Sequence, residues 1–110
     1  MSSEQRKVKQ AEREADVENM TPVVITTSHR GVFFGYVQQA KLEETMTLKN
    51  ARMCVFWPET VKGVLGLAAT GPLAGSKIGP AVPSLTVNNV DALMEMTREA
   101  VQRWEKGPWT

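Results

Sequence analysis

The sequence predicts an α+β fold: a small, strongly curved antiparallel sheet or a small barrel, with a C-terminal helix and a polar N-terminal helix. Three observations support this expectation. Stretches such as VVITT and GVFFGYVQQ are rich in β-branched and aromatic residues, which favour strands. Apolar residues near the C-terminus recur with a helical spacing. The first twenty residues are polar and contain neither Gly nor Pro, a composition that favours a helix.

The composition is that of one small domain with a modest core. The chain has 110 residues, of which 42% are hydrophobic, and a net charge of +1. We divide it into a polar helix or arm at residues 1–20 and a single β-rich domain at residues 21–110. The balanced charge excludes a strong general attraction to nucleic acid. A polar N-terminus, no long apolar stretch and a single cysteine predict a cytoplasmic protein without membrane partners.

The strands are predicted in chain order from their patterns. VVITT, residues 23–27, is β-branched throughout and predicts the first strand. After the polar turn SHRG, GVFFGYVQQ predicts a second strand with apolar residues on both faces. TMTLKNARMCVFW is expected to pair with it as an antiparallel hairpin, with a bulge or bend at NAR and a continuous apolar run before Pro58.

The C-terminal part combines a strand and a helix. LTVNNVDALMEM alternates around Asn88 and Asn89, which favours a strand in two pieces that runs to about Met96; a helix that begins at Asp91 is the alternative. Thr97 is expected to cap a helix over residues 97–106, and Gly107-Pro108 to end it.

GLAATGPLAGSKIGP, residues 66–80, is the Gly-rich segment and the first candidate site. Pro72 stands where a Walker phosphate loop needs lysine. The leucines among its glycines predict an ordered loop packed on the core rather than a linker. A looser phosphate cradle is the functional alternative, because glycine N–H groups, hydroxyls and a cation bind phosphate. Its candidate ligand residues are Thr70, Gly71, Gly75, Ser76 and Lys77.

A second candidate cluster lies near the ends and bends of the first three strands. Guanidinium groups pair with phosphates, and aromatic or imidazole rings stack on bases. The alternative is that the arginines pair with acidic residues and that the tryptophan belongs to the core. The candidate residues are His29, Arg30, Tyr36, Asn50, Arg52 and Trp57.

The sequence contains no recognisable catalytic set. His29 is its only histidine and lies in a polar turn, whereas Cys54 lies in an apolar run, so the two are not expected to form a dyad. A lone histidine with scattered carboxylates lacks the spacing of metal ligands. We therefore expect neither an enzyme nor a bound cofactor or metal.

HRGVFFGYV, TLKNARMCVFW and GLAATGP, followed by LTVNNVDALMEMTREAVQRWEKGPW, resemble a family of small uncharacterised bacteriophage and prophage proteins over residues 22–109. The resemblance implies a phage origin and a domain of unknown function, and it supplies no catalytic residues. GVFFGYVQQ and TMTLKNA with the late NNVDALME strand are also similar to Sm-like SH3 barrels, which assemble into rings and bind RNA.

These expectations lead to a non-enzymatic binding protein encoded by a phage and located in the host cytoplasm. Its expected role is that of an anti-defence sponge that sequesters a nucleotide immune signal in pockets between the subunits of a homo-oligomer. One alternative is an Sm-like oligomeric RNA-binding protein. The other is an inhibitor of a host protein that acts by direct contact through the N-terminal helix.

Overall fold

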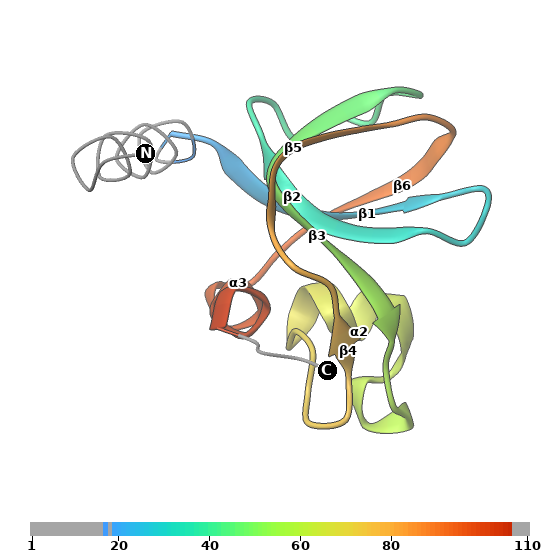
Figure 1. Ribbon diagram of the computed structural model, residues 1–110, viewed down its shortest axis with the longest axis vertical. Helices are drawn as coiled ribbons and strands as arrows, with labels where there is room; N and C mark the ends of the chain where they lie inside the picture. The colour runs from blue at the N-terminus through green and yellow to red at the C-terminus, as the bar shows by residue number, and fades with distance from the viewer. Residues whose placement is uncertain (1–16, 18, 107–110) are drawn as a thin grey trace, which may run out of the picture.

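The computed structural model describes residue 17 and residues 19–106, and it confirms the α+β class. The helix predicted for residues 1–20 and the Gly107-Pro108 stop therefore lie largely or wholly outside the described residues. In chain order the elements are β1 (Thr21–Thr27), β2 (Val32–Val37), β3 (Met46–Phe56), the 3-10 turn η1 (Glu59–Val61), α2 (Gly63–Ala69), β4 (Lys77–Ile78), β5 (Val82–Val87), β6 (Val90–Glu95) and α3 (Arg98–Lys106) (Figure 1).

The described strands form one antiparallel sheet around β3. Its strand order is β4-β3-β2-β1-β6. Along the free edge of β3, the first half of the strand pairs with β5 and the last residues pair with β4. Figure 1 shows the sheet curling, so that β3 and β5 pass over β1 and β6. β5 pairs with β3 and β6 pairs with β1, so the sheet stays open between β5 and β6. The curved sheet is thus confirmed, and the closed SH3 or Sm-like barrel is not formed.

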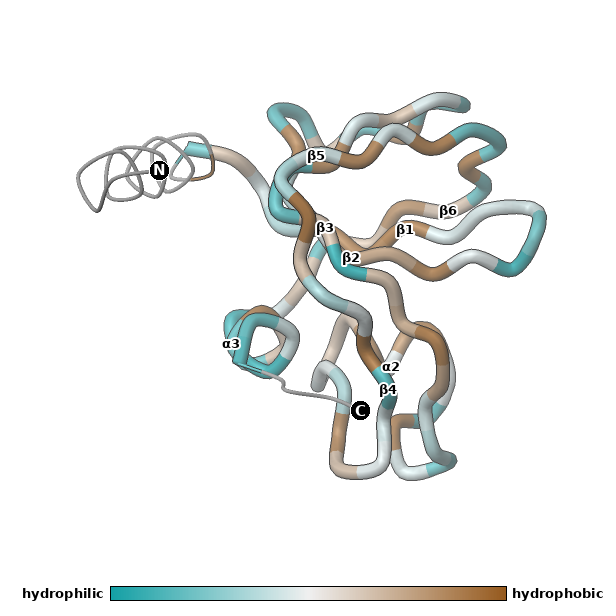
Figure 2. Tube along the Cα trace, viewed as in Figure 1, coloured by the Kyte–Doolittle hydropathy of each residue, from teal (hydrophilic) through white to brown (hydrophobic). Residues whose placement is uncertain are grey.

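Each face of the sheet has its own apolar core. Inside the curl, Ile25 and Leu48 are fully buried and pack with Val90, which is 8% exposed. On the other face, α2 and α3 cover Phe34, whose ring stacks on Trp104 with centroids 5.2 Å apart. Figure 2 shows apolar stretches along the strands and hydrophilic residues at the hairpin turns. The two-sided apolar pattern of GVFFGYV therefore reflects burial on both faces.

The bend predicted at NAR is a bulge in β3. Asn50 has a φ of 50°, a conformation that Asn tolerates better than most residues. The β2–β3 register shifts between Phe34 and Tyr36, opposite this point. Gly35 lies here because a Cβ would come within 2.6 Å of the Leu48 Cβ. The bulge turns the second half of β3 away from the curl and toward the helices.

The predicted two-piece strand and the helix that follows it are confirmed within the described residues. β5 and β6 are the two pieces of the predicted strand, joined at Asn88-Asn89, where Asn89 has a φ of 58°. The Thr97 hydroxyl accepts a hydrogen bond of 3.0 Å from the Ala100 N–H, so Thr97 caps α3 as expected. Within the described residues, no helix is long and apolar enough to cross a membrane.

The Gly-rich segment differs from the predicted continuous loop. Its first four residues complete the helix α2, and Lys77-Ile78 form the short strand β4. Gly66 lowers the helix propensity of this stretch, which hid the helix from sequence reasoning. Glycine is required there because a Cβ would lie 1.6 Å from the Val61 carbonyl oxygen.

Gly66→Ala is expected to destabilise the protein by about 3 kcal/mol, because overpacking against a backbone carbonyl outweighs the roughly 1 kcal/mol that alanine adds to helix propensity. Urea unfolding measures this change. Gly79→Ala is the matched control, since the nearest atom to its Cβ would be the Met53 oxygen at 3.7 Å. Equal stability of the two variants would contradict the close approach at Gly66.

Candidate functional site

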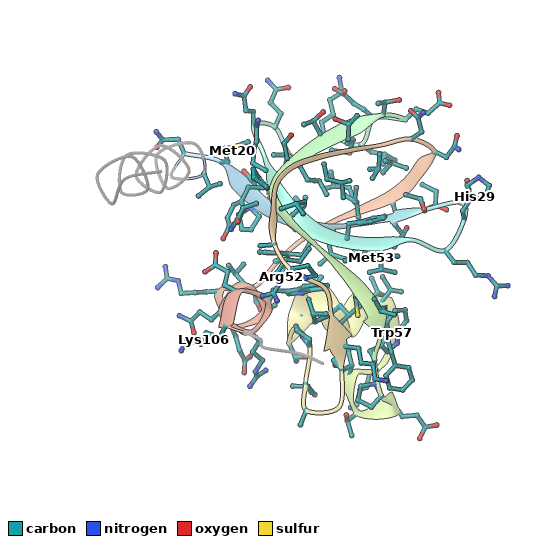
Figure 3. All side chains as sticks on the ribbon, in the orientation of Figure 1. Met20, His29, Arg52, Met53, Trp57 and Lys106 are labelled. Atoms are coloured by element: carbon teal, nitrogen blue, oxygen red, sulfur yellow. The ribbon has the colours of Figure 1, made fainter. Side chains whose placement is uncertain are left out.

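The structure places the predicted ligand residues in separate parts of the molecule. Figure 3 shows His29 at the tip of the β1–β2 hairpin, Arg52 beside α3 and Trp57 beyond the end of β3. The two predicted clusters therefore do not merge into one site. The hydrogen bonds and burial of each predicted residue determine whether it is available to bind a ligand.

The hairpin tip carries His29 and Arg30, both exposed. Arg30 has a φ of 65°, and its N–H donates to the Thr27 carbonyl over 3.0 Å. The Thr27 hydroxyl accepts a hydrogen bond of 3.1 Å from the Gly31 N–H. The backbone of the turn is thus well defined, and it holds His29 in solvent, whereas Cys54 is buried.

Arg52 and Tyr36 meet the C-terminal end of α3. The Tyr36 hydroxyl donates to the Glu105 carboxylate, and Asn50 lies two residues before Arg52 on β3. Arg52 Nε donates to the Gly79 carbonyl over 2.8 Å, and its Nη1 donates to the Trp104 carbonyl over 2.8 Å.

These contacts give Arg52 a structural role. The last carbonyls of a helix lack partners within the helix and carry a partial negative charge, which the guanidinium satisfies. Partial burial lowers the pKa of Arg52 because it disfavours the charged form. A phosphate at this point would face helix carbonyls and the Glu105 carboxylate. The geometry therefore disfavours the predicted phosphate contact of Arg52.

Thr70 and Gly71 pack against α3 instead of cradling an anion. The Thr70 hydroxyl donates to the Gly66 carbonyl over 3.0 Å, and the Thr70 carbonyl accepts from Arg103 over 2.7 Å. The N–H of Gly71 donates to the Gly66 carbonyl, and a Cβ on Gly71 would lie 2.9 Å from the Ala100 oxygen. The polar groups at this end of the Gly-rich segment thus bind within the fold.

The end of β3 is the one described place where residues of both predicted clusters come together. Lys77 of β4 pairs with Phe56 of β3, one residue before Trp57. Gly75 has a φ of 96°, and the atom nearest to a Cβ placed on it would belong to the Pro58 ring, at 3.5 Å. Ser76 is 3% exposed, and its hydroxyl has no hydrogen-bond partner among the described residues.

Exposed apolar side chains adjoin this place. The exposed fractions are 42% for Met53, 67% for Val55 and 51% for Phe56. We call Met53, Val55, Phe56 and Lys77 together the β3 exit surface. Sequence reasoning predicted MCVFW as a continuous apolar run, but within it only Cys54 is buried, and Trp57 packs partly buried against the core, as the alternative interpretation of the tryptophan predicted. The signal was present, since strand alternation places Met53 and Val55 opposite to Cys54.

Cys54 has the environment of a core residue. Its thiol donates a hydrogen bond to the Phe56 carbonyl over 3.4 Å. Burial raises the pKa of the thiol to about 11. The thiolate is the reactive form of cysteine, so this thiol is a poor nucleophile. Among residues 17 and 19–106, no group of three or more His, Cys, Asp or Glu side chains is arranged to hold a metal ion.

Comparison with known proteins identifies a family. The model of a family described as a domain of unknown function, DUF6948, matches residues 20–104. No curated protein and no solved structure matches the chain significantly. The match begins where the predicted N-terminal helix ends, and it includes every described strand. The implied domain of unknown function is confirmed, whereas the phage origin stays a prediction.

Arg52→Lys is expected to lower the free energy of unfolding by about 2 kcal/mol, because an ammonium cannot reproduce the guanidinium hydrogen bonds to separate carbonyls. Urea unfolding measures the loss. Arg30→Lys, in the exposed turn, is the matched control and should stay within about 0.5 kcal/mol of the parent. A similar loss in both variants would show that the Arg52 contacts do not hold α3.

The Cys54 thiol is expected to react slowly in the folded protein. Its pKa of about 11 against an ordinary 9.0 leaves roughly a hundredfold less thiolate at pH 8. A disulfide-exchange dye, which reports this thiol alone, should therefore react at least that much faster in denaturing urea. Equal rates in the two conditions would contradict the burial of Cys54.

Proposed function

The chain belongs to the family of the domain of unknown function DUF6948, and we propose that this protein binds and sequesters a nucleotide signal without converting it. The proposal includes an origin in a phage and action in the host cytoplasm as an anti-defence sponge. The observation that carries it is an exposed aromatic ring with a cation as its cross-strand neighbour, Phe56 beside Lys77.

The two side chains suit the two halves of a nucleotide. Residues paired across an antiparallel ladder have Cβ atoms about 5 Å apart, so the Lys77 ammonium reaches a phosphate attached to a base on Phe56. Base stacking on an aromatic ring contributes about 1–3 kcal/mol. Trp57 follows Phe56, and exposed Gly75 leaves room beside Pro58. Of the predicted residues, exposed Gly75 and Lys77 thus belong to the proposed site, while Trp57, which packs against the core, and buried Ser76 lie beneath its border.

The apolar part of the β3 exit surface supports the homo-oligomer in the proposal. Met53 and Val55 expose apolar area beside Phe56, and contiguous exposed apolar area marks contact surfaces. A second copy placed over Met53 and Val55 would leave Phe56 and Lys77 at the rim of the contact. The nucleotide would then lie between subunits, where protein covers most of its surface.

Binding without conversion is supported by the state of the reactive side chains. Cys54 is buried with a raised pKa, and His29 lies at the hairpin tip, away from Trp57 (Figure 3). The proposed site itself contributes an aromatic ring and an ammonium, groups that bind a nucleotide and do not by themselves cleave it.

The same surface favours one other candidate function, an inhibitor of a host protein that acts by direct contact. Met53 and Val55 have no role in stacking a base, whereas they suit an apolar protein partner. RNA binding stays a further alternative from the sequence, and it predicts affinity for single strands that falls steeply with salt.

Calorimetry against cyclic dinucleotides and cyclic ADP-ribose isomers tests the proposal. Phe56→Ala and Lys77→Ala should each weaken binding about 10- to 100-fold, as expected for the loss of a stacked base or a paired phosphate. Leu65→Ala and Arg98→Ala are matched controls that remove an exposed apolar residue on α2 and an exposed cation on α3, and they should bind like the parent.

Native mass spectrometry of the purified protein completes the test. It should show a homo-oligomer that retains ligand, and denaturation should release that ligand unchanged. A released product would indicate an enzyme. The absence of heat across the panel, together with a complex formed with a host protein and lost in Val55→Asp, would replace the sponge with the inhibitor.

A further inference from the structure

A polar pocket of about 300 Å³ lies in the connection between β2 and β3 and was not foreseen from the sequence. Its lining combines side chains that are apolar, amide, hydroxyl and charged. The lining residues are Val37, Gln38, Gln39, Lys41, Glu43, Thr45, Met46 and Thr47. Figure 1 shows the β2–β3 connection along the upper rim of the curled sheet, far from the end of β3.

The pocket is built on fixed parts of the fold. Val37 and Met46 are 4% and 7% exposed and belong to the core inside the curl, so the floor of the pocket is rigid. At the rim, the Lys41 N–H donates to the Gln39 carbonyl over 2.8 Å.

The far wall is tied to the β5–β6 turn. The Val90 N–H donates to the Glu44 carbonyl over 3.0 Å, and the Thr45 hydroxyl donates to the Asn88 side chain. The hydroxyls of Thr47 and Thr86 lie 2.8 Å apart and are hydrogen-bonded. These hydrogen bonds fix the wall of the pocket, which reduces the ordering cost of binding a ligand.

The two charged residues of the pocket are of opposite sign and do not pair. Lys41 and Glu43 both line it, and neither forms an ion pair in the described part of the chain. Their charges are thus separated within one cavity and remain open to a ligand. The net charge of the lining is zero, so a phosphate attracted by Lys41 would be repelled by Glu43.

We propose that this pocket binds a small zwitterion of the amino-acid or dipeptide class. Its carboxylate faces Lys41, its ammonium faces Glu43, and its amide contacts the Gln38 or Gln39 side chain. Charge-assisted hydrogen bonds are stronger than neutral ones, and a ligand with both charges forms two of them. A volume of about 300 Å³ equals roughly ten water molecules at about 30 Å³ each, so a dipeptide such as glycylglycine fits with room left for bridging water. The site is independent of the proposed nucleotide site.

An NMR titration of the ¹⁵N-labelled full chain with glycylglycine tests the proposal. Shifts should be confined to residues 37–47 and to the neighbouring turn at residues 88–90. Acetate and ethylamine each carry one of the two charges and should bind about fivefold more weakly than the dipeptide, the upper range for the loss of an exposed ion pair.

Lys41→Gln and Glu43→Gln should each weaken dipeptide binding by the same factor of about five. Lys106→Gln and Glu59→Gln make the same chemical changes at exposed positions outside the pocket and should leave it unchanged. No shift at residues 37–47, equal binding of acetate, or equal weakening by the control variants would each overturn the proposal.

Discussion

The rest of the fold depends on the attachment of α3 to the sheet through Trp104. Its ring is fully buried and stacks on Phe34 of β2, and its Nε1 donates to the Leu67 carbonyl of α2 over 3.0 Å. One side chain thus joins the sheet to both helices. Thr97 donates to the Ala69 carbonyl over 2.7 Å, and Arg103 donates to the Thr70 carbonyl. Together with the contact from Arg52 to Gly79, these donors fix the Gly-rich segment along its length.

This attachment explains why the Gly-rich segment is ordered and is not a phosphate loop. Each of these hydrogen bonds uses a carbonyl of the segment, and the donors are side chains of α3, of Thr97 just before it and of β3. A phosphate cradle needs the opposite arrangement, with N–H groups that converge on a ligand. Several N–H groups of the segment instead bind inside it, at Thr70, Gly71 and Ser76. The glycines therefore serve close packing, and the segment positions β4 beside β3.

Local signals were sufficient to predict every described strand except β4, the division of the last strand at Asn88-Asn89 and the Thr97 cap, because each depends on residues that are neighbours in sequence. Long-range features were not predictable. Gly66 made the helix α2 hard to predict, and glycine is required at this position because the Val61 carbonyl leaves no space for a Cβ. The role of Arg52 depends on where α3 ends. The exposure of Phe56 depends on where the neighbouring strands end. The sheet is open because β5 pairs with β3 while β6 pairs with β1.

Both proposed binding sites follow from the length of β3. It has 11 residues, more than either β2 or β5 can cover, so its two ends lack full cross-strand neighbours. At its start, Met46 and Thr47 pair with β5 but not with β2, whose pairing reaches only Lys49. These two residues and the β2–β3 connection before them line the polar pocket. Toward its other end, Met53 is the last residue paired with β2, and the register with β4 shifts between Cys54 and Phe56. Val55 lies at this shift and is the most exposed apolar residue of the strand. Because β3 extends beyond its pairing with β2 at both ends, it provides two recognition surfaces on one rigid element. The different residues at the two ends give these surfaces different chemistry.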